Sequence, residues 1–331
     1  MSSAARPAPP SAAPPPSAND SSRPHAATRP RASRARVAVA FAAVYVIWGS
    51  TYLGIKFAIQ TLPAFLMAGA RFLVAGTILY VWTRRRDPGA ASPPTPVEWG
   101  RALLVGGLLL FGGNGAVVWA SHSVPSGVVS LLVASVPIWM VVLEWLRPGG
   151  TRPTPRVVAG LLLGFAGMAL LITARGGTIG GAHVPLAGAL VLLAGSLSWA
   201  VGSLASRSQR FPRSLMLSTA MQMLGGGALM TLAGLARGEL AGFSPAQVST
   251  VSWLAWVYLF TFGSLIGFTA YIWLLDNVSA ASAATYAYVN PVVAVFLGWL
   301  LAGEAVTSRM LIAAATIVGA VALITAKKAK R

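Results

Sequence analysis

The segment Trp48–Ala58, WGSTYLGIKFA, is the part of the sequence that comes closest to a known chemical motif. A phosphate-binding loop has the pattern G-x-x-x-x-G-K-[ST], in which backbone amides and the lysine converge on phosphate. Gly49 and Gly54 have this separation, but Ile55 occupies the lysine position and Lys56 follows one residue late. One residue turns a helical side chain by about 100°, and the preceding run VAVAFAAVYVI carries no strand–turn signal. The segment is therefore predicted to be part of a helix and not a nucleotide site.

As part of a helix, this segment presents a different set of functional groups. Trp48, Tyr52 and Lys56 follow one another at intervals of four residues, so they lie along one slowly drifting helix face. Lys56 falls in the last turn of the predicted helix. A cation at this position either extends to the lipid headgroups or stands at the outer mouth of a transport pathway. The sequence leaves both interpretations open.

Arg71 is a cation in the middle of an apolar run. It is the ninth residue of the run 63–82, near the midplane of a membrane span. Placing a cation at this depth costs about 2.5–3.5 kcal/mol of insertion free energy. No acidic residue lies comparably deep, because Glu144, Asp276 and Glu304 all fall near the ends of apolar runs. Arg71 is therefore expected to face a wet cavity as a substrate contact, or to bond helix carbonyls as a structural clamp.

The lack of a deep carboxylate also restricts the substrate. An exporter that exchanges protons for cationic drugs needs a membrane-embedded acid to hold both in turn. The sequence therefore disfavours an organic cation and favours a neutral, zwitterionic or anionic compound.

Other polar and helix-distorting residues complete the candidate pathway. Pro137 and Pro291 lie in the middle of apolar runs, where each removes a backbone donor and clashes with the carbonyl four residues earlier. These two prolines are 154 residues apart. Helix kinks at corresponding positions of the two halves of a chain either mark a binding site or are tolerated by packing. Trp119 and His122 are equally consistent with interfacial anchors, and Asn114 with an amide satisfied inside the bundle. The candidates are Trp48, Tyr52, Lys56, Arg71, Asn114, Trp119, His122, Pro137, Trp199, Ser203, Tyr286, Asn290 and Pro291.

The composition indicates an integral membrane protein. The chain has 331 residues, of which 56% are hydrophobic and 10% charged, and its mean hydropathy is +0.70, whereas soluble domains carry about 25% charged residues. The net charge of +18 does not indicate nucleic acid, because no continuous basic face is interleaved with aromatics. The absence of cysteine excludes thiolate metal sites, and the three histidines have no metal-binding spacing. We expect no cofactor or metal, and as partners a small-molecule substrate and the lipid bilayer.

Ten segments are long and apolar enough to cross the hydrocarbon, which takes about 20 residues. Residues 1–36, rich in Ala, Pro, Ser and Arg, are predicted to form a disordered basic tail; the first span is too long for a signal peptide. Residues 327–331 form a basic C-terminus. The predicted spans are 37–59, 63–82, 99–121, 124–146, 155–174, 185–206, 213–236, 250–275, 279–301 and 308–326.

The distribution of basic residues orients these spans. Of the 25 Lys and Arg residues, 20 fall on the side of the N-terminus, three on the other side and two within spans. Such an asymmetry follows the positive-inside rule. It predicts that both chain ends are cytoplasmic, as ten spans require.

The tryptophans indicate an internal repeat. Trp99, Trp119 and Trp145 precede Trp253, Trp273 and Trp299 by 154 residues each, and Trp48 precedes Trp199 by 151. A repeat of five helices contains an odd number of crossings, so the second copy must be inverted relative to the first. Inverted repeats with a site at their interface are typical of secondary transporters.

Several segments also resemble the EamA-type drug/metabolite transporter superfamily, in particular its exporters of bacterial inner membranes. The resemblance covers about residues 37–326 and rests on VYVIWGSTYLGIKFAI, LMAGARFLVAG, VPSGVVSLLVASVPIWM, SLSWAVGSLASR and ATYAYVNPVVAVFLGWLLAGE. It implies an all-α membrane protein of ten helices in a 5+5 inverted repeat (37–174 and 185–326), a central cavity, and export by alternating access. The superfamily's substrates are diverse, so the resemblance does not name one.

The sequence thus predicts a secondary transporter that exports small polar or amphipathic metabolites, such as amino-acid-like compounds, or xenobiotics. The alternative is a membrane scaffold or lipid scramblase without a defined small-molecule substrate. An enzyme is not expected, because no metal motif, carboxylate pair or nucleophile–base set is present in the sequence.

Overall fold

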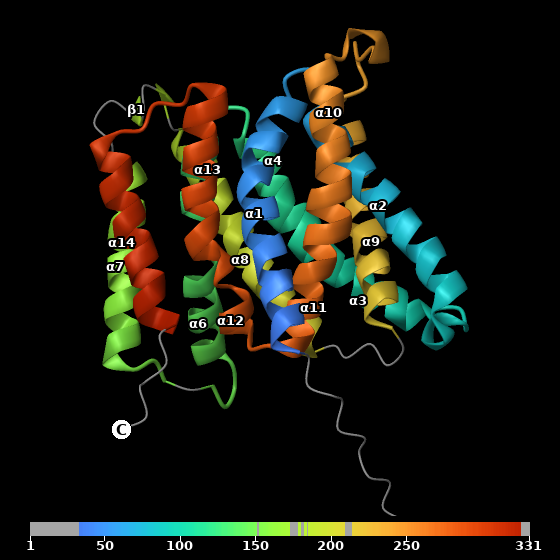
Figure 1. Ribbon diagram of the computed structural model, residues 1–331, viewed down its shortest axis with the longest axis horizontal. Coiled ribbons are helices and arrows are strands. Elements are labelled where there is room, and N and C mark those ends of the chain that lie inside the picture. Colours follow the sequence, from blue (N-terminus) through green and yellow to red (C-terminus); the bar gives the residue numbers. More distant parts are fainter. Residues whose placement is uncertain are drawn as a thin grey trace, which may run out of the picture. The chain divides into compact units, whose positions relative to one another are not determined.

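The computed structural model describes residues 33–150, 152–172, 178–179, 182–183, 185–208 and 214–325. Long helices dominate it (Figure 1). The first half contains α1 (Arg34–Ala58), α2 (Ala64–Arg86), η1 (Pro88–Ala90), α3 (Pro96–Gly106), η2 (Gly107–Asn114), α4 (Gly115–Ala120), α5 (Ser126–Val133), α6 (Val136–Leu146) and α7 (Pro155–Ile172). The second half contains α8 (Leu186–Ser208), α9 (Leu215–Ala236), η4 (Pro245–Gln247), α10 (Thr250–Tyr258), η5 (Leu259–Phe268), α11 (Thr269–Asn277), α12 (Ala280–Ala283), α13 (Tyr286–Ala302) and α14 (Ser308–Thr325).

The helices overlap the predicted spans, and the number of ten membrane crossings stays a prediction. Seven helical stretches in the described residues are long and apolar enough to cross a membrane. The predicted spans 155–174, 279–301 and 308–326 overlap the shorter apolar helices Pro155–Leu170, Val289–Ala302 and Ser308–Ala320. The start of α1 and the end of α14 lie at the same end of the bundle (Figure 1).

Two details differ from the sequence-based expectation. The first helix begins at Arg34, inside the predicted tail, because the Ser33 side chain caps it by accepting a hydrogen bond from the Arg36 amide. A short antiparallel pairing of β1 (Thr178–Ile179) with β2 (Ala182–His183) joins the two halves of an otherwise helical chain. The predictions for residues 1–32 and 326–331 lie outside the described residues.

Two of the membrane-crossing helices contain a stretch of π-helix. η2 lies between α3 and α4, and η5 lies between α10 and α11. The last residues of these stretches, Asn114 and Phe268, are 154 residues apart, the same separation that relates the tryptophans. Wide turns of this kind are rare and frequently occur at functional sites.

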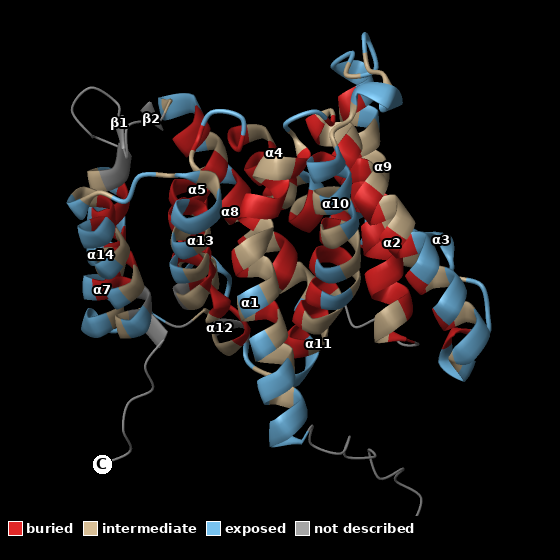
Figure 2. Ribbon diagram, turned by 45° about the horizontal axis from the view of Figure 1, so that its top comes forward, coloured by how far each residue is buried: buried red, intermediate tan, exposed pale blue. Residues whose placement is uncertain are grey.

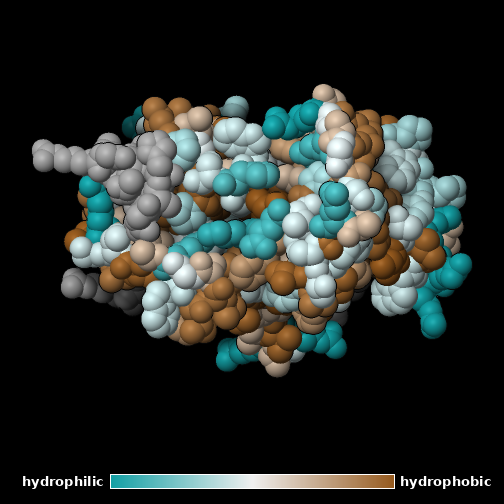
Figure 3. All heavy atoms as spheres, turned by 90° about the horizontal axis from the view of Figure 1, so that it is seen from above, coloured by the Kyte–Doolittle hydropathy of each residue, from teal (hydrophilic) through white to brown (hydrophobic). Residues whose placement is uncertain are grey.

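The exposed surface is as apolar as a lipid-facing surface must be. Large hydrophobic side chains such as Val46, Leu162, Leu190 and Leu254 are more than half exposed, which the hydrocarbon accommodates and water would not. Buried residues concentrate on the central helices, among them α4 and α8 (Figure 2). Seen from above, hydrophilic residues lie across the middle of this end, and hydrophobic residues are prominent along its edges (Figure 3).

Glycines allow the backbones of neighbouring helices to approach closely. The triplet Gly225–Gly227 on α9 lies where α2 and α3 cross it: a Cβ on Gly226 would come within 2.6 Å of the Gly106 carbonyl oxygen. Small residues at such crossings are how membrane helices gain packing contacts without a hydrophobic driving force. The triplet is therefore a packing feature.

We expect Gly226→Ala to destabilise the folded state by about 1–3 kcal/mol, because its methyl group meets backbone and the helices must separate. Gly100→Ala is the matched control, since beyond its own turn of helix no atom of the described residues lies within 4 Å of the added Cβ. Thermal unfolding in detergent would measure both. Equal melting temperatures for the two variants would contradict the close approach.

Candidate functional site

A cavity lies in the middle of the helix bundle. The space open to water-sized molecules has a volume of about 60 Å³, which is room for a few waters in this conformation. Both halves of the chain contribute to its wall. The lining residues are Trp48, Thr51, Tyr52, Ile55, Arg71, Phe72, Leu110, Gly113, Asn114, Val117, Val133, Val136, Gly195, Ser196, Trp199, Gly263, Phe268 and Tyr286.

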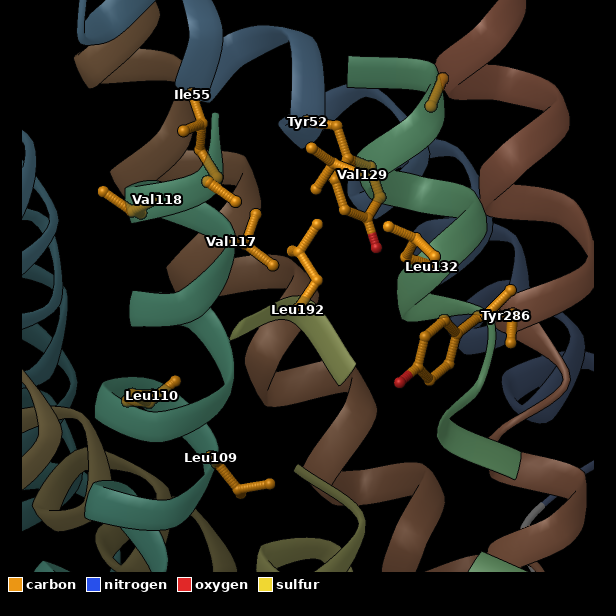
Figure 4. Close-up of a cluster of buried hydrophobic side chains, with 14 of the residues drawn as sticks. Tyr52, Ile55, Leu109, Leu110, Val117, Val118, Val129, Leu132, Leu192 and Tyr286 are labelled. Carbon is orange, nitrogen blue, oxygen red and sulfur yellow. The ribbon is translucent and has the colours of Figure 1, made fainter. Parts of the chain in front are cut away.

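The hydrophobic part of the wall converges from several helices. Tyr52 on α1, Val117 on α4, Leu192 on α8 and Tyr286 on α13 project toward the space between them (Figure 4). Leu192 is 1% exposed and belongs to the same buried cluster. The cavity therefore sits inside the core, and a ligand in it exchanges water for a largely apolar surface.

Arg71 supplies the positive charge of the cavity. Its side chain is only 3% exposed. Its Nη2 donates a hydrogen bond of 3.0 Å to Asn114 Oδ1, and its guanidinium lies 4.3 Å from the centroid of the Phe72 ring. Its Nε and Nη1 have no hydrogen-bond partner among the described residues. Burying a cation with two unpaired donors costs desolvation free energy unless an anion pairs with it.

Asn114 holds this cation from the end of a π-helix. It is the last residue of η2, so its side chain leaves the helix where the wide turns give way to α4. Its carbonyl oxygen receives the Arg71 bond, a charge-assisted contact that fixes one side of the guanidinium. The Nε and Nη1 donors of the guanidinium are left without a partner among the described residues.

Four aromatic rings from four helices form a second part of the site. We call Trp48, Trp199, Tyr271 and Tyr286 the aromatic cluster. Trp48 contacts each of the other three, with ring centroids 5.5, 4.9 and 5.3 Å away respectively. Such ring pairs are worth about 0.5–1.5 kcal/mol each beyond the area they bury. The cluster is therefore a firm wall that joins both halves of the chain.

Hydrogen bonds fix the orientation of this cluster. Trp48 Nε1 donates to the Gly263 carbonyl oxygen at 3.2 Å, a group in the middle of the η5 π-helix. Trp199 Nε1 donates to Tyr271 Oη at 3.2 Å, and that hydroxyl lies 2.7 Å from Ser203 Oγ. Each of these polar atoms thus has a partner, as buried polar groups require.

At the end of the bundle where α1 finishes, one acidic residue joins three segments. Glu304 Oε1 lies 2.6 Å from Lys56 Nζ, and the Glu304 side chain is 9% exposed. The carboxylate also accepts hydrogen bonds from the Ser126 amide at 2.9 Å, the Ser126 hydroxyl at 3.0 Å and the Gly127 amide at 3.2 Å. It therefore caps the positive end of α5 while it pairs with α1.

The local backbone places Glu304 at this point. Gly303 ends α13 with φ of 64°, the left-handed conformation that glycine adopts without strain. Both Gly303 and Glu304 then donate their amides to the Gly298 carbonyl. A Cβ on Gly298 would lie 2.6 Å from Glu304 Oε2. The two glycines therefore let the carboxylate fold back over the helix end.

The surroundings of Glu304 keep it ionised. Burial alone would raise the pKa of this carboxyl, but the hydrogen bond from Lys56 and the amides of Ser126 and Gly127 lower it below its ordinary value. A carboxyl whose pKa falls on folding stabilises the folded state at pH above its unfolded-state pKa. That contribution is lost only as the pH falls through the lower, folded-state pKa. The ion pair therefore persists at neutral and mildly acidic pH.

Six of the candidates from the sequence line the cavity: Trp48, Tyr52, Arg71, Asn114, Trp199 and Tyr286. Two more support it from behind. Ser203 bonds Tyr271 in the aromatic cluster. With the Asn290 side-chain amide assigned the orientation that satisfies its neighbours, its nitrogen donates to the Tyr286 carbonyl oxygen at 3.2 Å and to that of Tyr45 at 3.1 Å.

The remaining candidates lie elsewhere. Lys56 neither reaches toward headgroups alone nor lines the cavity, because Glu304 holds it. Trp119 is partly buried against the core, and His122 is exposed in the turn after α4. Neither of these two lines the cavity.

The two prolines differ from the expected central kinks. Pro137 stands at the start of α6, after a break at Ala134 and Ser135, a position where a missing amide donor costs little. Pro291 lies inside α13 and faces an apolar groove between α13 and α14 rather than the cavity. The break before Pro137 adjoins the site through Val133 and Val136, and the break between α12 and α13 adjoins it through Tyr286.

Sequence reasoning missed several lining or supporting residues. Tyr271 was not singled out, although Trp273 nearby was paired as a repeat-mate, and it contacts three rings of the site. Thr51, Ser196 and Phe268 also line the cavity. One signal could have found Phe268 and Tyr271. They follow Asn114 and Val117, which line the cavity, by the repeat distance of 154 residues.

The chain is similar to known proteins over nearly all of its length. The model of the EamA-like transporter family matches residues 36–173 and 186–326. The chain is 40% identical over 288 residues to the Uncharacterized inner membrane transporter YedA of Escherichia coli (strain K12), which covers 86% of this chain and 89% of that protein. It is 26% identical over 301 residues to the Uncharacterized transporter YvbV of Bacillus subtilis (strain 168), covering 89% and 93%.

A solved crystal structure with 25% sequence identity superimposes with a TM-score of 0.63, covering 88% of this chain and 96% of that one. The fold, the apolar helices and both family matches agree. The chain therefore belongs to the EamA-like transporter family and is a multi-pass transporter of the bacterial inner membrane.

Proposed function

We propose that this transporter works by alternating access between two inverted five-helix repeats, residues 37–174 and 185–326, with both chain ends cytoplasmic. The two family matches, to residues 36–173 and 186–326, support this division. The π-helices η2 and η5 end at positions 154 residues apart. In addition, the predicted repeat-mates Trp48 and Trp199 contact each other at 5.5 Å, as residues near a pseudo-two-fold axis do.

The substrate is a small organic anion or zwitterion that carries an aromatic or other apolar group. The observation that carries this proposal is the buried Arg71 guanidinium, with two donors that no described residue accepts. A carboxylate matches the guanidinium fork in a bidentate way. The aromatic cluster then receives the apolar part of the molecule.

The transporter exports this compound, which belongs among amino-acid-like metabolites or xenobiotics. The predicted orientation, with both ends inside, and the resemblance to exporters support this direction. A gradient or an exchange drives transport, since the sequence contains no ATP-binding motif.

A matched series of ligands tests the charge preference. Purified protein in detergent is heated with 3-phenylpropionate, 3-phenylpropionamide or 3-phenylpropylamine, which share a ring and differ in charge. We expect the carboxylate to raise the melting temperature most, because a ligand that binds only the folded state stabilises it by mass action. Greater stabilisation by the amine would overturn the proposal. Transport of the best ligand is then measured in proteoliposomes against empty liposomes.

A further inference from the structure

The contacts around Glu304 join three segments that each lead to a residue of the cavity wall. Lys56 is in the last turn of α1, one residue after Ile55, which lines the cavity. Ser126 is the first residue of α5, the helix that leads to Val133 in the cavity wall. Glu304 follows α13, which contributes Tyr286. One carboxylate thus ties together the ends of three helices that surround the site.

We infer that Lys56, Glu304 and Ser126 form the outer gate of the cavity, and that Glu304 is the residue that holds it closed. This inference rests on the proposed alternating access. The three segments cannot move apart at this end without breaking the 2.6 Å ion pair or the bonds to the start of α5.

The chemistry of the gate suits a reversible closure. The carboxylate receives charge-assisted bonds from an ammonium group and two backbone amides, so the closed state is strongly preferred in the absence of a competing force. The Lys56 side chain is one-third exposed, so water can solvate the ammonium group as the gate opens. The cost of opening is therefore limited by solvation.

A second acid at the same end does not have this arrangement. Glu239 accepts hydrogen bonds from the Phe65 and Leu66 amides and so caps the start of α2. It ties a loop to one helix, whereas Glu304 ties together α1, α5 and the segment after α13. Glu239→Gln is thus a matched control for the loss of a helix-capping carboxylate.

The absence of native cysteine allows a direct test. Thr51→Cys places one thiol in the wall of the cavity, and a membrane-impermeant maleimide is applied either to intact cells or to inside-out vesicles. Into this background we would introduce Lys56→Met or Glu304→Gln. Both remove the ion pair, and the second retains one of the two oxygen acceptors at the start of α5.

We expect either variant to raise the labelling rate from outside by about tenfold and to lower the rate from inside, because the population shifts toward the outward-open state. Glu239→Gln should leave both rates within about twofold. Faster labelling from both sides would indicate general loosening and overturn the gate, as would unchanged rates in both variants. The readout requires no substrate, so it stands apart from the outcome of the phenylpropionate series.

Discussion

Replacement of Arg71 by methionine is expected to abolish binding and transport of the anionic substrate while the protein still folds. Truncating one partner of a buried charged pair costs about 2–5 kcal/mol, and each 1.4 kcal/mol is tenfold in affinity. Affinity for the carboxylate ligand should therefore fall by about 100-fold or more. Isothermal titration with 3-phenylpropionate, together with uptake into proteoliposomes, would measure the loss.

The stability of the same variant separates the two roles that the sequence left open for Arg71. As a structural clamp, its loss would destabilise the fold. As a substrate contact with two unused donors, its replacement by an apolar side chain removes a desolvated charge, so the unfolding free energy should stay equal or rise. A melting temperature well below that of the parent protein would support the clamp.

Asn114→Asp provides the matched control at the same site. It places a carboxylate 3.0 Å from Arg71 Nη2 at nearly constant volume. The internal ion pair should compete with the substrate and raise the stability of the empty protein. Weaker binding together with a higher melting temperature is therefore the expected combination, opposite to that of a simple packing defect.

Replacement of Trp48 by alanine is expected to produce the largest loss of stability among single substitutions at the site. Its ring touches Trp199, Tyr271 and Tyr286, and large-to-small changes of a buried aromatic cost about 3–5 kcal/mol. The melting temperature should fall by about 10 °C. Trp48→Phe should cost only about 1–2 kcal/mol, mainly because the Gly263 carbonyl loses its partner.

Trp299→Ala is the control for the loss of a tryptophan as such. Trp299 is 55% exposed on α13, so its removal should change the unfolding free energy by under about 1 kcal/mol. Thermal unfolding in detergent measures all three variants. If Trp48→Ala and Trp299→Ala melted alike, the aromatic cluster would have no special role in holding the two halves together.

The parts of the site that could be predicted from the sequence are those set by the free-energy cost of placing a side chain in an apolar environment. A cation in the middle of an apolar run must face the interior, and Arg71 does. Tryptophans at fixed separations pointed to Trp48 and Trp199, which meet in the cavity wall. The span boundaries were accessible for the same reason, since hydrocarbon thickness sets the length of each apolar run.

Contacts between distant segments were beyond sequence reasoning. Lys56 and Glu304 are 248 residues apart, and both stand near helix ends, where either could have been solvated. Nothing in the residue types specifies that a wide turn replaces an ordinary one, so η2 and η5 were not anticipated. The sequence analysis placed kinks at Pro137 and Pro291, but the helix breaks lie before these two residues. At Pro137 the break puts the proline in the first turn of α6, where a missing amide donor costs little.

The two stretches of wide turns have a mechanical consequence. A π-helical turn contains one residue more than an α-helical turn, and its position along a helix is not fixed by any single bond. If the extra residue moved from one turn to the next, the helical segment that it crossed would rotate by about 100° about the helix axis. Each half of the chain contains one such π-helical stretch beside the cavity, ending at Asn114 and at Phe268. Side chains there could thus change partners while the helix ends stay anchored.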